Sequence, residues 1–330
     1  MRAASTVIKG GHRLALNRFV ILGRVGMDLY ADPPGTPIEH ATRYVAAIGG
    51  SAGNIAVALA RQGAEAALLT RVSDDAVGRY CIAELARYGV DISHVTTQAG
   101  EVRTSLAVAE TRVVGCQTVL YRNGAADFAL TIADVDRIDF SKTAALVVTG
   151  TALAAEPSRS ATLYALARAK AAGVTTVMDV DFRAYSWTTA AEAATVCLNA
   201  ARQVDVVIGN DEEFGLLAGG LPHGKALAET LTRQGAMFTI YKRGPDGSTT
   251  FTPNGGFDTP IFPVTALKPM GAGDGFMAGL LAGLGAGQDI ELAVRRGAAT
   301  AAIIVSGIGC APASPTRAAV ADFIAQRTAP

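Results

Sequence analysis

The sequence predicts an α/β fold: a doubly wound, mostly parallel sheet flanked by helices, with a small antiparallel β lid. Three observations predict it. Short apolar runs alternate with longer segments of helical spacing, the pattern of a parallel sheet covered on both faces. Several helical segments end directly before a glycine, a common C-terminal signal. Two β-rich stretches, at 27–47 and 103–122, lack helical spacing and indicate inserted antiparallel hairpins.

The elements follow from these patterns in chain order. Short apolar runs predict strands at 19–22, 66–70, 144–149, 175–179, 204–208 and 238–242. Apolar residues at helical spacing predict helices at 52–62, 77–88, 158–172, 190–201, 226–233, 273–285, 290–306 and 316–326. We interpret 18–328 as one domain and 1–17 as an N-terminal extension.

Composition narrows the function classes. Among 330 residues, 29 are basic and 29 acidic, so the net charge is zero and no electrostatic footprint for nucleic acid or a membrane surface is expected. No apolar run reaches the roughly 18 residues that a membrane helix needs. The four cysteines lie far apart without a CxxC pair, which disfavours zinc or disulfides and favours the reducing cytoplasm.

The segment "GAGDGF" at 271–276 contains the strongest candidates for catalytic residues. Gly271 and Gly273 allow backbone N–H groups to converge beside a helix N-terminus, with Ala272 between them. Such a turn can hold a developing negative charge, such as a phosphoryl group in transfer. Asp274, in the first helical turn, could accept a proton from an attacking hydroxyl. A simple capped helix fits the local spacing equally well.

A second glycine turn precedes the helix at 52–62. Gly49 and Gly50 let the backbone approach a ligand, and the amide of Asn54 can both donate to and accept from sugar hydroxyls. Asp28 lies just past the first strand, where open α/β sheets often bind ligands. For these residues, an ordinary turn or an outward-facing polar side chain is the alternative.

Two further clusters follow strands. In "MDVDFR" at 178–183, Arg183 could hold a phosphate or a carboxylate. In "GNDEEF" at 209–214, Asn210 and Glu213 are three residues apart, so they could serve magnesium from one helical face, directly or through water. A capping or solvated role is at least as consistent with each cluster.

One phosphate-loop pattern is a decoy. Gly219, Gly224 and Lys225 have the G-x4-G-K spacing, but Ala226 follows where a hydroxyl for magnesium is needed. Pro222 also removes one of the loop N–H groups.

The order of motifs is more specific than any single motif. The segments "GRVGMD", "GGSAGN", "RVSDDAVG", "DVDFR", "NDEEF", "KRGPDG" and "GAGDGF" follow one another along the chain. This order resembles the ribokinase-like, or PfkB, family of carbohydrate kinases over roughly 18–328. The resemblance implies an α/β kinase domain with a β lid, ATP and Mg²⁺ as cofactors, and transfer of the γ-phosphate to a sugar hydroxyl.

The resemblance also implies roles for individual residues. Asp274 is the expected base, and Gly271, Ala272 and Gly273 form the expected anion hole. The remaining expected roles are sugar binding by Asp28, Gly49, Gly50 and Asn54, magnesium binding by Asn210 and Glu213, and nucleotide contact by Lys242, Gly244 and Gly247.

Within the family, three segments resemble kinases of a six-carbon keto-deoxy sugar acid from myo-inositol breakdown. They are "GRVGMDLYAD", "DVDFRAYSW" and "AAIIVSGIGCAPASPT". Arg183 and Arg103 would then meet the acid's carboxylate. The 2-keto-3-deoxygluconate kinases have a comparable D-x-N-x-R segment, in which Asp181 of this chain replaces the Asn.

One departure from the family concerns the residues before the glycine turn. Lys268 and Pro269 stand where relatives usually have D-T, whose acid helps a potassium site. We therefore expect monovalent-cation activation to be weak or absent, with Lys268 supplying the positive charge. Two alternatives remain: a kinase of another sugar or a nucleoside, and a non-catalytic sugar-binding relative. Lid strands also suggest a homodimer by edge pairing.

Overall fold

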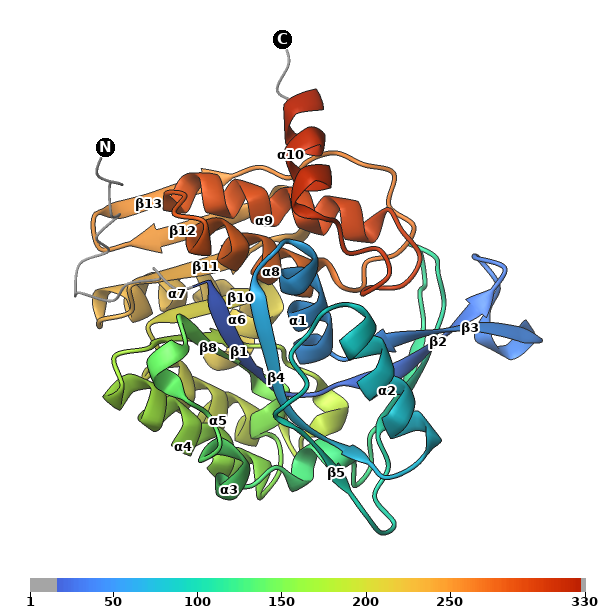
Figure 1. Cartoon of the computed structure of the whole chain (residues 1–330). Coiled ribbons are helices and arrows are strands. Elements are labelled where there is room, and N and C mark those ends of the chain that lie inside the picture. The colour runs from blue at the N-terminus through green and yellow to red at the C-terminus, as the bar shows by residue number, and fades with distance from the viewer. Residues whose placement is uncertain (1–16, 328–330) are drawn as a thin grey trace.

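The structure is a computed structural model that describes residues 17–327, and it confirms the predicted α/β class (Figure 1). The N-terminal extension expected at 1–17 lies outside the described residues except for Asn17, as does residue 328. The nine strands of the large sheet, in spatial order, are β13 (Gly255–Thr259), β12 (Ser248–Thr252), β11 (Phe238–Lys242), β10 (Val206–Asn210), β9 (Thr175–Asp179), β8 (Ala145–Thr149), β1 (Arg18–Leu22), β4 (Glu65–Ser73) and β5 (Val95–Gln98).

Seven of these strands, from β11 to β5, run parallel, while β12 and β13 add an antiparallel edge. The sequence analysis predicted six of the parallel strands and missed β5, β12 and β13. The sequence of β12, STTFT, is mostly polar, and that of β13, GGFDT, begins with two glycines. Strand β12 pairs with β11, and β13 pairs with β12. This pairing, more than their own propensity, makes these segments strands.

Helices cover both faces of the large sheet. The helices are α1 (Ser51–Arg61), α2 (Ala76–Arg87), α3 (Ile132–Val135), α4 (Ser158–Ala171), α5 (Ala190–Ala201), α6 (Asp211–Leu217), α7 (Gly224–Arg233), α8 (Ala272–Gly285), α9 (Ile290–Val305) and α10 (Arg317–Gln326). Helices α1, α2, α8 and α9 share one hydrophobic core, and α4, α5, α6 and α7 share the other. Strand β1 serves both cores, because Phe19 and Ile21 face the first while Val20 and Leu22 face the second.

Helix α8 is buried along most of its length and packs closely on α9. Gly279 makes this approach possible, since a Cβ atom there would lie 2.9 Å from the carbonyl oxygen of Arg296. The packing holds the N-terminus of α8 in a fixed position relative to the sheet. The decoy glycines at 219 and 224 instead flank a short 3₁₀ turn between α6 and α7.

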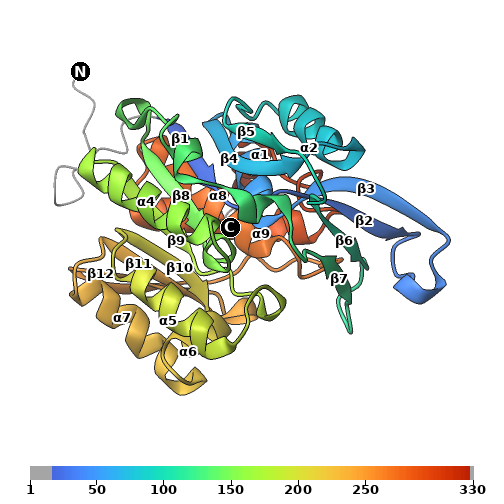
Figure 2. The same ribbon diagram turned by 90° about the horizontal axis from the view of Figure 1, so that it is seen from below.

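A second sheet projects from the body beside β5 and α2 (Figure 2). It contains β2 (Gly26–Asp32), β3 (Arg43–Gly49), β6 (Ser105–Ala109) and β7 (Thr118–Tyr121), in the order β3-β2-β6-β7. The lid was predicted to be antiparallel, and that is wrong for its central pair. Strands β2 and β6 are parallel, because each starts at the body of the molecule and runs outward.

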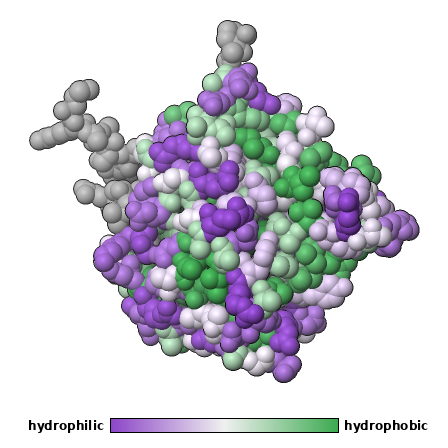
Figure 3. Space-filling model, turned by 45° about the vertical axis from the view of Figure 1, so that its right-hand side comes forward, coloured by the Kyte–Doolittle hydropathy of each residue, from purple (hydrophilic) through white to green (hydrophobic). Residues whose placement is uncertain are grey.

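The surface on the lid side is a mosaic of hydrophobic and hydrophilic residues (Figure 3). Tyr44, Val45, Val119 and Tyr121 are exposed on the lid strands. Among residues 17–327, no helix is long and apolar enough to cross a membrane.

Candidate active site

The turn at Gly271–Gly273, called the glycine turn below, opens helix α8. Gly271 is its N-cap and has a left-handed φ of 81°, which favours glycine. A Cβ atom on Gly271 would also lie only 2.6 Å from the Sγ atom of Cys310. No side chain caps the helix, so its first N–H groups can bind an external anion.

Asp274 lies in the first turn of α8, partly exposed, and its Oδ2 accepts a hydrogen bond of 2.8 Å from Nδ2 of Asn54. Asn54 comes from α1, which packs on α8. The surrounding protein atoms desolvate the carboxyl and, with the nearby charges of Asp181 and Asp179, raise its pKa to about 7. A carboxyl with a pKa near neutrality is well suited to accept and release a proton at physiological pH.

Acidic and basic side chains converge where β9 ends. Asp181 has a φ of 37°, accepts a 2.9 Å hydrogen bond from the Thr151 hydroxyl and pairs with Arg183 at 3.0 Å. Asp181 is the main cause of the raised pKa of Arg183. Burial raises the pKa of Asp179, and the positive charge of Lys242 opposes this rise. The left-handed backbone at Asp181 is uncommon for a non-glycine residue and aims its carboxylate back toward the Thr151 hydroxyl.

Asn210 and Glu213 form a capping box at the start of α6. Oδ1 of Asn210 accepts from the Glu213 N–H at 2.8 Å, and Oε2 of Glu213 accepts from the Asn210 N–H at 2.7 Å. The other Glu213 oxygen accepts from the Phe182 N–H at 3.2 Å. Between residues 17 and 327, no three His, Cys, Asp or Glu side chains form a metal-binding group. Contact with magnesium through water stays a prediction.

Lys242 ends β11 opposite the glycine turn. Its Nζ lies 3.2 Å from the point that a Cβ atom on Gly273 would occupy. The same charge acts on the buried carboxyls of Asp179 and Glu213. Gly244 and Gly247, in the turn to β12, have φ values of 52° and 80°. A Cβ atom on Gly247 would lie 2.2 Å from the Thr259 carbonyl oxygen, whereas one on Gly244 would meet no atom within 4 Å.

Asp28 lies within lid strand β2, inside the β-rich stretch predicted at 27–47, and the alternative of an ordinary turn residue is wrong. The strand begins at Gly26, only four residues after β1 ends, so the chain enters the lid at once. The Tyr30 hydroxyl donates to Oδ2 of Asp28 at 3.0 Å, and burial raises the pKa of Asp28. Gly49 leaves room for this carboxylate, because a Cβ atom there would lie 2.1 Å from its Oδ1.

Gly50 is the N-cap of α1, with a φ of 87°. Its hydrogen atoms leave space for the chain at Arg24, whose carbonyl oxygen would lie 2.6 Å from a Cβ atom on Gly50. The structure therefore brings the turn before α1, the lid strand β2 and, through Asn54, the glycine turn together.

Arg103 is the predicted residue that the structure does not bring to this cluster. Its side chain is 61% exposed. It bonds to the carbonyl oxygens of Gly100 and Val102 and lies 3.6 Å from Glu101. These contacts are all with its own loop.

Lys268 is fully buried, and the sequence signal for it was only its unusual place before the glycine turn. Its Nζ donates to the carbonyl oxygens of Met270 at 2.8 Å and Ile304 at 3.2 Å, and lies 3.9 Å from Sγ of Cys310. The Tyr30 hydroxyl lies 3.5 Å from the same sulfur. A continuous polar chain thus links Asp28 in the lid to the backbone just before the glycine turn.

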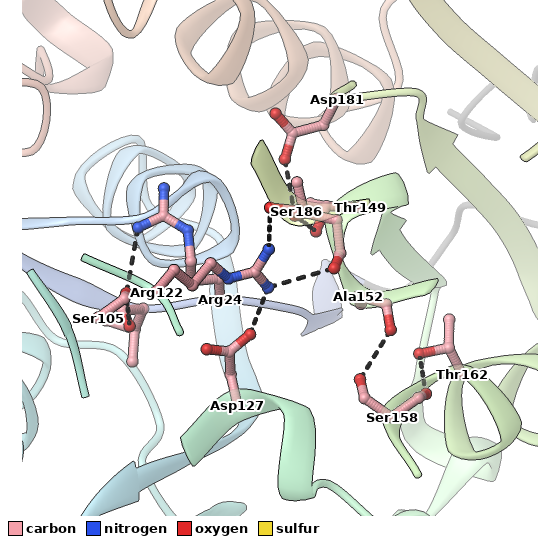
Figure 4. A network of polar contacts seen from close by, with 12 residues as sticks. Arg24, Ser105, Arg122, Asp127, Thr149, Ala152, Ser158, Thr162, Asp181 and Ser186 are labelled. Carbon is pink, nitrogen blue, oxygen red and sulfur yellow. Dashed lines mark hydrogen bonds and ion pairs between the residues drawn. The ribbon is translucent and has the colours of Figure 1, made fainter. Parts of the chain in front are cut away.

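Two arginines that the sequence analysis did not single out lie on the lid side of the cluster (Figure 4). Arg122 follows β7 and is buried, with hydrogen bonds to Asp127, the Thr151 carbonyl and, at 2.8 Å, the Ser186 hydroxyl. Arg24 follows β1 and donates to the Ser105 hydroxyl at 3.2 Å. No sequence signal distinguished either arginine from a surface residue.

Two cavities of about 310 Å³ each lie away from this cluster. One is lined by residues of β1, β4 and α2, and the other lies between α9 and α10. Neither cavity is lined by a predicted site residue.

Comparisons with known families, sequences and solved structures show what the chain as a whole is similar to. The model of the pfkB family of carbohydrate kinases matches residues 16–317. A 5-dehydro-2-deoxygluconokinase from Photobacterium profundum is 39% identical over 313 residues, which cover 93% of this chain and 95% of that protein. A protein of the same name from Geobacillus kaustophilus is 36% identical, covering 93% of each. The crystal structure of fructokinase from Vibrio cholerae with fructose, ADP and calcium superposes with a TM-score of 0.83 at 27% identity, covering 94% of this chain and 99% of that one.

Proposed function

This chain belongs to the pfkB family of carbohydrate kinases, and from that premise we propose that it phosphorylates 5-dehydro-2-deoxy-D-gluconate with ATP. The enzyme is a carbohydrate kinase. ATP as the phosphoryl donor is supported by the fructokinase from Vibrio cholerae, whose structure holds ADP. The substrate proposal is supported by the names of near full-length relatives at 34–39% identity. An acidic substrate also agrees with the several arginines near the site, because a guanidinium can bind a carboxylate.

One observation is the main support for phosphoryl transfer. The carboxyl of Asp274, whose pKa is about 7, lies in the first turn of α8, where no side chain caps the helix. In the proposed reaction, Asp274 takes the proton of a sugar hydroxyl as its oxygen attacks the γ-phosphorus of ATP. A new P–O bond forms, the bond to the bridging oxygen breaks, and ADP leaves with that electron pair. Asn54 keeps the carboxylate oriented through its hydrogen bond.

The glycine turn and Lys242 would stabilise the charge on the phosphoryl group in flight. The N–H groups of Gly271, Ala272 and Gly273 lie at the positive end of the α8 dipole. The Lys242 ammonium lies next to Gly273. Gly244 and Gly247 would shape the turn along the nucleotide, while Asp28, Gly49, Gly50 and Asn54 would hold the sugar.

The residues near Lys242 suit magnesium. Asp179 and Glu213 are buried carboxyls that form no ion pair within 4 Å among residues 17–327. Excess buried negative charge of this kind favours a cation, and magnesium prefers oxygen ligands and retained waters. We propose that Asn210 and Glu213 hold it through water. Bound magnesium neutralises charge on the phosphates.

We also propose a homodimer formed through the lid, supported by the exposed Tyr44, Val45 and Tyr121 on its strands. Light scattering of the purified chain checks this, and a monomer at all concentrations would contradict it. We place the enzyme in the cytoplasm, where ATP is available. The four cysteines are free thiols, as expected in a reducing compartment.

A substrate panel tests the proposed function. The purified enzyme is given ATP with 5-dehydro-2-deoxygluconate, 2-keto-3-deoxygluconate, fructose or ribose, and ADP release is measured. We expect the first acid to have the highest kcat/KM. A neutral sugar as the best substrate would overturn the proposal, and 2-keto-3-deoxygluconate as the best would replace one sugar acid with the other.

A further inference from the structure

Three arginines, Arg24, Arg122 and Arg183, lie close enough to Tyr185 for their charges to act on its hydroxyl, and we call them the arginine cluster. They come from separate parts of the chain: the β1–β2 connection, the end of β7 and the segment after β9. Arg122 bonds to Ser186, the residue after Tyr185. Desolvation by the protein atoms around it raises the pKa of the Tyr185 hydroxyl, and the charges of all three arginines oppose this rise. Tyr185 itself is 58% exposed, so solutes can reach the region that it borders.

Two members of the arginine cluster already have a carboxylate partner. Arg122 pairs with Asp127, and both side chains are almost completely buried. Arg183 pairs with Asp181 at 3.0 Å. In each pair the carboxylate already offsets the positive charge of the guanidinium, so a second carboxylate is attracted less strongly than it would be by an unpaired arginine.

Arg24 differs from the other two. Over residues 17–327, no carboxylate lies within 4 Å of its guanidinium, and its hydrogen bond is to the Ser105 hydroxyl. Its Nε is buried without a hydrogen-bond partner. Figure 4 shows one end of the guanidinium on Ser105 and the other end pointing away from it. Arg24 therefore carries a positive charge that no neighbouring acid neutralises directly.

The surroundings of Arg24 match a small acidic ligand. Its charge acts on Asp28, the proposed partner of a sugar hydroxyl, and on Tyr185. Asp28, Asp181 and Asp274 would repel an anionic sugar, so a site for a sugar acid needs one unpaired cation. A guanidinium presents two parallel N–H donors to a carboxylate and remains charged at any physiological pH.

We infer that Arg24 binds the carboxylate of the sugar acid and so selects acids over neutral sugars. This inference rests on the proposed function, because it concerns the acid group of the proposed substrate. Arg24 thus replaces Arg103 as the expected ligand of the carboxylate. Arg183 then has the role of orienting Asp181, with which it pairs. The Ser105 hydroxyl holds Arg24 from the first strand of the second lid hairpin.

The test compares Arg24→Gln and Arg24→Lys with the wild type on two substrates. One is 5-dehydro-2-deoxygluconate, and the other is its counterpart with CH₂OH in place of the carboxylate. For the acid, Arg24→Gln should raise KM by about 10- to 100-fold, the loss of a hydrogen bond to a charged group, with kcat nearly unchanged. For the neutral counterpart KM should hardly change. Arg24→Lys, which keeps the charge without the two-donor geometry, should fall between.

Arg43→Gln is the matched control, since Arg43 lies at the far end of the lid and its side chain is 73% exposed. An equal rise in KM for both substrates, or no rise for the acid, would overturn the inference. Should Arg24→Gln not fold, Arg24→Lys carries the same comparison. Failure of the proposed function looks different, because the wild type itself would then not turn over the acid.

Discussion

The glycine turn and the arginine cluster lie in one site, yet different interactions position them. At the glycine turn, a left-handed backbone at Gly271, a close contact with Cys310 and the carbonyl bonds of Lys268 determine the geometry. In the arginine cluster, side-chain pairs such as Arg122–Asp127 and Arg183–Asp181 determine it.

This difference has a functional consequence. The proposed role of the glycine turn concerns the phosphoryl group, which is the same for every substrate, and Gly271 in that turn leaves no space for a Cβ atom. In the proposed site, the arginine cluster faces the variable part of the substrate, and we expect that side chains there can be exchanged without moving the turn. We expect substitutions at the turn to act on kcat and substitutions in the arginine cluster to act on KM, and the predictions below test this division.

Asp274→Asn should have the largest effect. The amide keeps the shape of the side chain but cannot accept the proton, so kcat should fall on the order of 10²- to 10⁴-fold. Rapid-quench or coupled ADP assays measure the loss, and the melting temperature serves as the folding control. Turnover within tenfold of the wild type would remove Asp274 from the proton transfer.

Gly271→Ala should follow, because it adds a Cβ atom 2.6 Å from Sγ of Cys310 at a left-handed position. The displaced N–H groups should lower kcat on the order of 10²-fold. Gly287→Ala is the matched control: its φ is 79° but no atom lies within 4 Å of the new methyl group. Both variants should lose roughly 1 kcal/mol from backbone strain, and only Gly271→Ala should lose activity. Equal kcat values in the two would refute the close-packing argument.

Lys268→Ala should destabilise the fold and slow turnover together. The change removes the Nζ donor from the carbonyl oxygens of Met270 and Ile304. Ile304 keeps a hydrogen bond from the Gly307 N–H, so the cost comes mainly from the unpaired Met270 carbonyl and is about 1–3 kcal/mol. Potassium or ammonium should restore part of the kcat of the variant, since either cation can contact both carbonyls. The wild type should respond little to potassium. Strong potassium activation of the wild type would show that Lys268 does not supply this charge.

The dependence of kcat/KM on pH should report the raised pKa of Asp274. Because the base must be deprotonated, kcat/KM should fall roughly tenfold per unit as pH drops below its pKa of about 7. Asp179, Asp181 and Arg183 all act on this carboxyl, and Asp181 is the strongest charge that raises its pKa. Asp181→Asn should therefore move the acidic limb to lower pH. A limb that stays in place would show that the two carboxyls are not coupled.

Arg103→Gln should have the smallest effect. The side chain is exposed and contacts only its own loop, so KM for the sugar acid should change by less than about twofold, as for most surface substitutions. Steady-state kinetics beside Arg24→Gln give the comparison. A tenfold rise in KM would restore Arg103 as a ligand of the carboxylate.

Much of the fold was predictable because its signals are local. Each predicted strand and helix is present, with ends shifted by up to three residues, since apolar periodicity and terminal glycines act within a few residues of each other. The missed strands share one cause, because pairing with a neighbouring strand forms them. Strand β5 pairs with β4, β12 with β11, and β13 with β12. The parallel pair β2–β6 likewise joins segments from two separate hairpins.

The sequence by itself determined the order of strands and helices, the glycine turn and the place of Asp274 in the first turn of α8, because these depend on neighbours along the chain. Only the tertiary structure decided the pKa of Asp274, the burial of Lys268 and the lack of a carboxylate partner for Arg24. Asn54 and Asp274 are 220 residues apart, and Tyr30 and Cys310 are 280 apart. The charge and solvation of each group depend on atoms that only folding brings close, and no local pattern encodes those distances.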